Sequence, residues 1–256
     1  MRSQSALVSL VCFVLGAAVA LAASYGVRFG WWDYATGLKI LAPGFVVGLV
    51  GTAAGGLWLA RALGGNSSVG WKFGVAGLAG SLVLVVVPLN ELRLILISPP
   101  IHDISTDPEY PPQFVALLPL RAGAQNGPEY DGGKTILVDG KRTTVAAAQK
   151  KAYPDIKPYF ALLGAANHHP QTTQFWRAFE RAKSEGFDIV AFSEKDGTIE
   201  ATHTSFWFGL VQDIAIRARA AGRIGARVDI RVKSRTGEND AGTAAALVRS
   251  YLQAMR

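Results

Sequence analysis

Three long hydrophobic runs fill the first part of the chain, and shorter apolar segments alternate with polar ones in the rest. The runs cover about residues 6–27, 40–60 and 73–90. Each approaches or reaches the roughly 20 apolar residues that a helix needs to cross a hydrocarbon core of about 30 Å. None of them shows the polar face of an amphipathic helix in a soluble protein. The pattern therefore predicts three transmembrane helices.

The first run has an alternative interpretation as a secretory signal peptide. Arg2 supplies a positive charge before it, and the Ala-rich stretch 17–24 offers small residues for cleavage. The two further runs favour retention of the first as a membrane span. Both interpretations stay open at this point.

Glycines recur at spacings of three and four along the second and third runs, so each set lies on one helix face. Small residues let helix backbones approach closely in lipid. The spacing favours packing inside a three-helix bundle, and the alternative is a seam between two copies of the chain. The helix-packing glycines are Gly44, Gly48, Gly51, Gly55, Gly74 and Gly77.

Aromatic residues mark the ends of the predicted spans. Trp31, Trp32 and Tyr34 lie between the first and second runs, and Trp71 precedes the third. Amphipathic rings of this kind prefer the headgroup layer. No acidic or basic residue lies inside a run, so no ion or proton pathway is indicated. The loop Arg61–Lys72 is cationic and free of acids, which slightly favours its placement in the cytoplasm.

Beyond residue 95 the apolar positions follow the short periods of a soluble domain. Alternation of apolar and polar residues predicts four strands. They cover about residues 187–192, 199–205, 213–219 and 227–233. One polar face on each strand is typical of an antiparallel sheet that is covered on one side.

Segments with apolar residues at helical spacing lie before and after these strands. It predicts helices over 144–152, 171–185 and 241–253. Asp240 precedes the last of them, where its side chain can accept hydrogen bonds from the first-turn amides. Helices and strands in this order predict a two-layer α+β domain with a sheet of about four strands. We therefore expect a transmembrane region over 1–94 and an α+β domain over 95–256.

Composition narrows the function classes. Half of the 256 residues are hydrophobic, 18% are charged and the formal net charge is +7. This excludes disorder as the main state. The single cysteine, Cys12, excludes an intrachain disulfide framework and a Cys-rich zinc module. Basic residues only slightly outnumber acidic ones beyond residue 90, and no aromatic residues alternate with them, so nucleic acid is not an expected partner.

Six basic side chains fall on the polar faces of the last two predicted strands. We call them the basic ladder and expect them on the uncovered face of the sheet. They could hold anionic lipid headgroups or an acidic polymer. The alternative is a solvated face that Glu200, Asp213 and Asp229 partly neutralise. The ladder consists of Arg217, Arg219, Arg227, Arg231, Lys233 and Arg235.

Asp103, Asp107 and His203 are the candidate catalytic groups. Paired carboxylates with a histidine can act as general acids and bases when a cleft holds them together. The alternative for the two acids is turn and cap chemistry beside prolines. The alternative for His203 is a hydrogen-bonded histidine on the apolar side of its strand.

Metal and cofactor binding have no local signal. The histidines are His102, His168, His169 and His203, and none has the spacing of a metal-binding motif. We therefore expect no metal site and no cofactor.

Three segments resemble the DUF1499 family over about residues 95–256. Ile101–Asp107 resembles the opening motif of its membrane-attached members. Phe206–Gly209, with the flanking hairpin strands, resembles its centre, and Ser234–Gly242 its end. The resemblance implies the family fold and a membrane-associated, often extracytoplasmic setting, and it implies no reaction. Within the last motif we expect Gly237, Asp240 and Gly242 to be structural.

These observations predict a protein of the bacterial inner membrane with an extracytoplasmic C-terminal domain. The leading hypothesis is a non-catalytic envelope module that binds a lipid or a partner protein. Its partners would be the bilayer, an anionic lipid or another membrane protein. One alternative is a membrane-tethered hydrolase that uses Asp103 and Asp107 with a histidine. The other is an assembly subunit, with a homo-oligomer formed through the glycine-rich helices.

Overall fold

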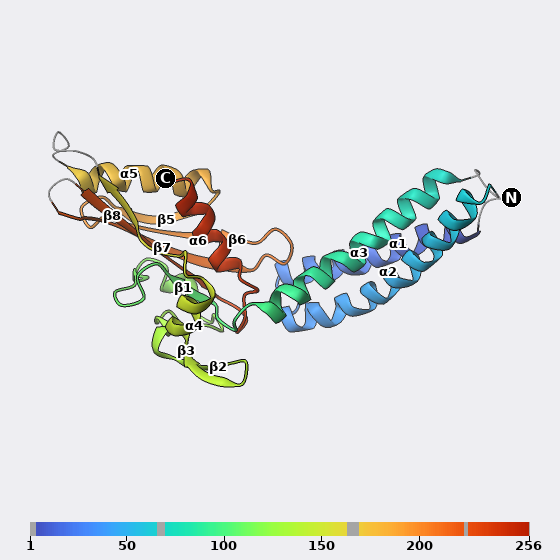
Figure 1. Cartoon of the computed structure of the whole chain (residues 1–256), viewed down its shortest axis with the longest axis horizontal. Helices are drawn as coiled ribbons and strands as arrows, with labels where there is room; N and C mark the ends of the chain where they lie inside the picture. Colours follow the sequence, from blue (N-terminus) through green and yellow to red (C-terminus); the bar gives the residue numbers. More distant parts are fainter. Residues whose placement is uncertain (1–3, 66–69, 163–168, 223–224, 256) are drawn as a thin grey trace. The chain divides into compact units, whose positions relative to one another are not determined.

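The computed structural model describes residues 4–65, 70–162, 169–222 and 225–255 (Figure 1). It consists of two compact units. The first, the helical unit, comprises residues 1–93 together with 206–209. The second, the sheet unit, comprises 94–205 and 210–256.

Three long helices form the helical unit, and each is long and apolar enough to cross a membrane. They are α1 (Gln4–Arg28), α2 (Tyr34–Leu63) and α3 (Trp71–Ile97), whose last turn belongs to the sheet unit. Asp33 starts α2, because its side chain accepts a hydrogen bond of 2.7 Å from the Thr36 amide. The three predicted spans are confirmed as helices, and each extends a few residues beyond its apolar run.

The glycine faces of α2 and α3 lie against neighbouring helices of the same bundle. All six helix-packing glycines are buried. A methyl group on Gly77 would meet the backbone of Ser9 and Leu10 in α1, and one on Gly48 would meet Leu84 in α3. Packing within one chain therefore accounts for the small-residue spacing.

An antiparallel sheet of six strands organises the sheet unit, in the order β1-β8-β7-β6-β5 with β4 also paired to β8. The α+β class is confirmed, with six strands instead of about four. The two strands that the sequence pattern misses, β1 and β4, are short. The strands are β1 (Asp103–Ser105), β4 (Tyr159–Leu162), β5 (Asp188–Ser193), β6 (Thr198–Thr204), β7 (Val211–Ala220) and β8 (Gly225–Ser234).

Helices α5 (Pro170–Ser184) and α6 (Thr243–Gln253) cover one face of this sheet (Figure 1). The apolar positions of β7 and β8 point toward them and form the main core, which includes Ile216, Val228 and Tyr251. Helix α4 (Val145–Ala152) packs beside a separate hairpin, β2 (Thr135–Val138) and β3 (Lys141–Thr144).

The second face of the sheet is also covered, by a long segment that we call the strap, residues 106–134. It contains two short 3-10 turns, η1 (Pro119–Arg121) and η2 (Asp131–Gly133). Phe114 and Leu117 of the strap form a small apolar cluster with Ala215 of β7. The expectation that this face is uncovered is therefore wrong.

Candidate functional site

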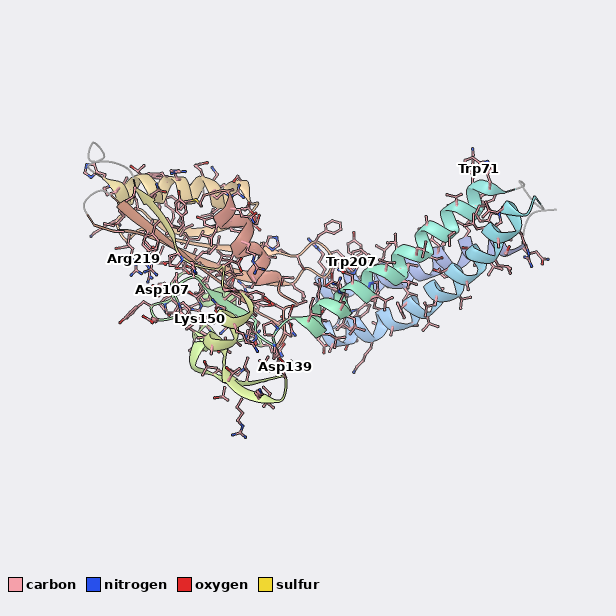
Figure 2. All side chains as sticks on the ribbon, in the orientation of Figure 1. Trp71, Asp107, Asp139, Lys150, Trp207 and Arg219 are labelled. Atoms are coloured by element: carbon pink, nitrogen blue, oxygen red, sulfur yellow. The ribbon has the colours of Figure 1, made fainter. Side chains whose placement is uncertain are left out.

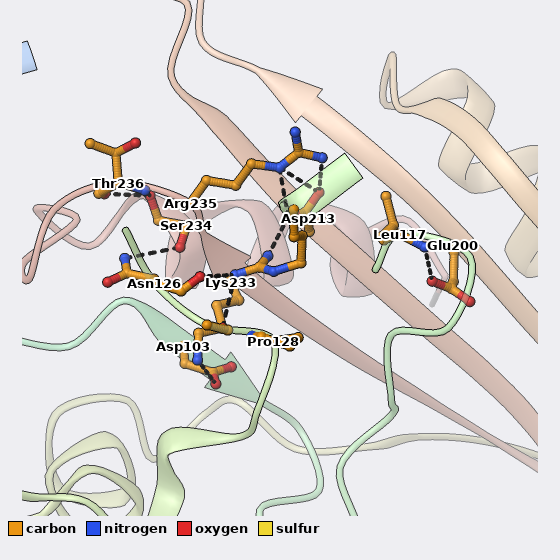
Figure 3. A network of polar contacts seen from close by, with 12 residues as sticks. Asp103, Leu117, Asn126, Pro128, Glu200, Asp213, Lys233, Ser234, Arg235 and Thr236 are labelled. Carbon is orange, nitrogen blue, oxygen red and sulfur yellow. Dashed lines mark hydrogen bonds and ion pairs between the residues drawn. The ribbon is translucent and has the colours of Figure 1, made fainter. Parts of the chain in front are cut away.

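Buried ion pairs occupy the space between the strap and the sheet (Figure 3). At their centre Arg231 donates to both carboxylate oxygens of Asp103, at 2.9 Å each, and both side chains are fully buried. Lys233 lies 3.3 Å from the same carboxylate and 2.8 Å from Asp131. Two cations thus pair with two acids, and this pairing offsets the desolvation cost of burying the four charges.

The same cations bind the backbone of the strap. Arg231 donates to the carbonyls of Pro128 and Glu129, at 3.0 and 2.9 Å, and Lys233 donates to Glu129 at 2.6 Å. The guanidinium of Arg231 also stacks over the Phe114 ring, 4.5 Å from its centroid. These contacts explain why the strap covers a face that the sequence pattern shows as polar.

A second ion cluster joins the outer part of the ladder to Asp107 and Asp229. Arg219 lies 2.8 Å from Asp107 and 3.2 Å from Asp229 (Figure 2). Arg227 contacts the same two acids at 2.6 and 2.8 Å. Arg217 contacts them at longer distances and donates to the Tyr110 carbonyl at 2.7 Å.

A third cluster surrounds Asp213 in β7. Arg235 donates to its two oxygens at 2.7 and 2.9 Å, and the buried Arg121 of the strap pairs with it from the other side. Arg121 also donates to the Asn126 carbonyl at 2.8 Å.

The Glu200 carboxylate holds the strap without a cation. It accepts hydrogen bonds from three backbone amides of the strap at 2.9 to 3.0 Å, including that of Leu117 (Figure 3).

The basic ladder is thus largely internal. Arg231 and Lys233 have 0% and 1% of their side chains exposed, so neither is available to an external anion in this fold. Arg219 is the most exposed member, at 38%, and it is already paired with two acids. Binding of an anionic surface stays a prediction for the partly exposed members alone.

His102 lies next to this network, and the sequence analysis gave it no role of its own. Its Nε2 is 3.0 Å from Asp131, and its Nδ1 is 3.1 Å from the Glu238 carbonyl. Both ring nitrogens face acceptors, and the imidazolium is the form that donates to both. Burial by itself would lower the pKa of His102. The hydrogen bonds to Asp131 and Glu238 outweigh burial and raise the pKa above its ordinary value.

An open groove of about 680 Å³ runs along His102 and the β2–β3 hairpin. Its walls are partly apolar, through Ile136, Leu137 and Val145. Lys134 and Arg142 line it as well, and within the described part of the chain neither has a recorded ion pair. The groove therefore combines an apolar wall with cations that are free to meet an anion.

The DUF1499 sequence profile, described as a protein of unknown function, matches residues 103–255. This match covers more than half of the chain. The chain belongs to the DUF1499 family. Neither a curated protein nor a solved structure matches it significantly. The matched range contains the strap, the three ion clusters and most of the groove, so these features lie within the DUF1499 domain.

The three candidate catalytic residues of the DUF1499 domain do not come together. Strand pairing aligns Asp103, Lys233 and Asp213 in one row, and directly paired side chains point to the same face. His203 pairs one position along, with Gln212, so it points to the opposite, helix-covered face, where its ring lies 6.2 Å from that of Phe187. Burial lowers the pKa of His203.

Asp107 and Asp103 belong to different ion clusters, since Arg219 and Arg227 hold Asp107 and Arg231 holds Asp103. The hydrolase hypothesis needs a carboxylate and a histidine that share a cleft. In this DUF1499 domain Asp103 lines the groove beside His102, Arg231 occupies both oxygens of Asp103, and neither Asp107 nor His203 lines the groove.

The last family motif shapes the start of α6. Asp240 accepts hydrogen bonds from the amides of Gly242 and Ala244, at 2.9 and 2.8 Å. Gly237 and Gly242 have positive φ angles of 85° and 79°, a conformation that side chains disfavour. Asp240 thus caps a helix that begins at Thr243, two residues later than the sequence indicates.

The described residues contain no group of three or more histidine, cysteine, aspartate or glutamate side chains that could hold a metal ion. His168, one of the four histidines of the DUF1499 protein, lies outside the described residues. His169 directly precedes α5 and is not among the residues that line the groove.

Proposed function

We propose that this DUF1499 protein is a membrane-anchored, non-catalytic module whose groove binds an anionic amphiphile, a lipid with a charged headgroup. The observation that carries the proposal is the pairing of groups along the groove. Asp103 and Asp131 are neutralised by Arg231 and Lys233, which leaves Lys134 and Arg142, together with Glu238, without an ion pair among the described residues and next to an apolar wall. Ligand sites characteristically combine apolar walls with a few convergent polar groups.

Chain connectivity supports a ligand drawn from the membrane. Helix α3 ends at Ile97, and Pro100 already lines the groove. Three residues span at most about 10 Å, so this edge of the groove lies within that distance of the last turn of α3. That turn is apolar and exposed, with Leu96 at 75%. The last turn of α3 therefore offers a lipid an apolar surface near one edge of the groove.

The charge state of His102 supports a binding role over catalysis. A general base needs a free lone pair directed at the proton that it removes. Both nitrogens of His102 face oxygen acceptors, so neither lone pair is directed into the groove to act as a base. Asp131 pairs with this ring, so the attraction for an anionic headgroup comes from Lys134 and Arg142.

We place the module on the outer side of a bacterial inner membrane. The acid-free loop between α2 and α3 and the family setting support this orientation. Alkaline phosphatase fused after Arg256 should be active in a bacterium. Activity of a reporter that works only in the cytoplasm, at the same position, would reverse the orientation.

Lipid mass spectrometry of the full-length protein tests the binding proposal. After extraction in mild detergent, the unmodified protein should retain anionic lipid. The double variant Lys134→Ala/Arg142→Ala should lose most of it. The matched control Lys150→Ala/Lys151→Ala removes two exposed cations of α4 outside the groove and should retain the lipid. Equal retention by both double variants would reject the groove as the site.

A further inference from the structure

The loop between β6 and β7 belongs with the membrane helices. Residues 206–209 join the helical unit, although both flanking strands are part of the sheet unit. Within the helical unit the Phe206 carbonyl accepts a hydrogen bond of 2.9 Å from Arg28, and the Trp207 carbonyl accepts one from Ser24. The Phe208 ring meets Tyr34 edge to face, with centroids 5.3 Å apart.

These contacts fix the backbone of the loop and leave two of its rings outside. The Phe206 side chain is 90% exposed and Trp207 is 40% exposed. Two adjacent exposed aromatic rings on an anchored loop are unfavourable in water, because their apolar area stays hydrated. An environment that takes up both rings would remove that cost.

The neighbouring residues indicate which environment this is. The same end of the bundle carries Phe29 and Trp31, whose side chains are 62% and 70% exposed, with ring centroids 5.6 Å apart. Tryptophan and other aromatic rings gather where membrane helices meet the headgroup layer. Arg28 lies beside them, and a cation at this depth can contact lipid phosphates.

We propose that Phe206 and Trp207 insert into the headgroup layer of the bilayer and make the β6–β7 loop a second membrane attachment of the DUF1499 domain. The domain is then attached to the membrane at two points of the chain, the end of α3 and this loop (Figure 2 labels Trp207). The partner that fits this loop is the lipid interface, because the exposed rings continue the aromatic group between α1 and α2. The proposal is independent of the groove.

Site-specific fluorescence quenching in lipid nanodiscs tests it on the full-length chain. With the sole cysteine removed by Cys12→Ala, an environment-sensitive dye is attached to Phe206→Cys. Tyr110→Cys is the matched control, because Tyr110 is also highly exposed, at 71%, and lies in the strap. Leu21→Cys, on the exposed surface of α1, is the positive control for lipid contact.

A lipid that carries a nitroxide near its headgroup should quench the dye at position 206 several times more strongly than the dye at 110. A lipid with the nitroxide deep in its chain should quench position 21 more than position 206. Equal, weak quenching at 206 and 110 would overturn the proposal. So would a dye at 206 that reports an apolar environment and no lipid quenching, because a second protein surface would then cover the loop.

A second position guards against a local effect of the substitution. Trp207→Cys carries the dye one residue further along, where the backbone carbonyl is held by Ser24. The proposal requires headgroup-level quenching at both positions. The groove variant Lys134→Ala should leave this quenching unchanged, so failure here is distinguishable from failure of the proposed lipid site.

Discussion

The strap face and the groove of the DUF1499 domain are both rich in basic residues, and they differ in how those residues are paired. Beneath the strap, each cation of the ladder contacts at least one carboxylate of the same domain. Along the groove, Lys134 and Arg142 have no recorded ion pair in the described structure. The difference teaches that the number of basic residues does not locate an anion site. Under the proposed function, the unpaired basic residues locate it.

The two regions also differ in what their charges stabilise. Arg231 joins β8, β1 and the strap at once, through Asp103 and two backbone carbonyls. Removal of one partner from such a buried pair leaves an uncompensated charge. Lys134 and Arg142 are exposed, and their loss leaves nothing buried without a partner. Substitutions in the two regions should therefore affect stability very differently.

The largest effect is expected at the centre of the strap face. Asp103→Asn leaves Arg231 and Lys233 buried with one carboxylate fewer, and it should destabilise the fold by about 3–5 kcal/mol. The control Asp155→Asn breaks the exposed pair with Arg249, whose side chains are 53% and 38% exposed, and should cost about 0–1 kcal/mol. Denaturant unfolding of the full-length protein in detergent measures both. Equal costs would show that the strap pairs behave as surface pairs.

Asp240 offers an intermediate case, because amides and not cations satisfy this partly buried acid. Asp240→Ala removes two hydrogen bonds at the start of α6 and should destabilise the domain by about 0.5–2 kcal/mol. Asp240→Asn keeps one acceptor oxygen for the two amides, so its cost should fall between zero and that of Asp240→Ala. The same unfolding measurement separates them. A loss with Asn as large as with Ala would assign Asp240 a role that depends on its charge.

A smaller effect is expected from the pH dependence of His102, which connects the two regions. Its hydrogen bonds raise the pKa of His102 in the folded state, so its stabilisation is present below the unfolded pKa and is lost as pH rises through the folded value. The pKa of Asp131 is lowered despite burial, because His102 and Lys233 donate hydrogen bonds to it. The stabilisation that Asp131 contributes is therefore lost as pH falls through the acidic range.

The variant His102→Gln isolates the pH-dependent stabilisation that His102 contributes. The difference in unfolding free energy between the unmodified protein and this variant should be larger at about pH 5.5 than at about pH 8. Thermal or denaturant unfolding at the two values measures it. A difference that is constant, or larger at the higher pH, would contradict the imidazolium assignment.

The sequence predicts what depends on long or regular patterns. The three apolar runs and the four alternating strands appear as helices α1 to α3 and as β5 to β8. Strand β1 was missed because it has only three residues, all of them buried, so it offers no alternation to detect. Strand β4 has only four residues, which is also too short for alternation to stand out.

The site was harder to predict, because its chemistry depends on contacts between distant residues. Alternation along β8 puts Arg231 on the polar face, and a polar face is normally taken as wet. Its partner Asp103 is 128 residues away, so the burial of the pair follows only from the fold. The same holds for His102, whose two acceptors come from the strap and from the loop before α6.

The central claim is that unpaired cations, and not the paired ladder, attract the ligand. It is tested most directly by binding of a short-chain anionic phospholipid to two full-length variants that each lose one positive charge. Lys134→Gln should weaken the affinity several-fold, and Arg219→Gln should leave it close to that of the unmodified protein. Equal weakening in both variants, or a loss confined to Arg219→Gln, would contradict the account.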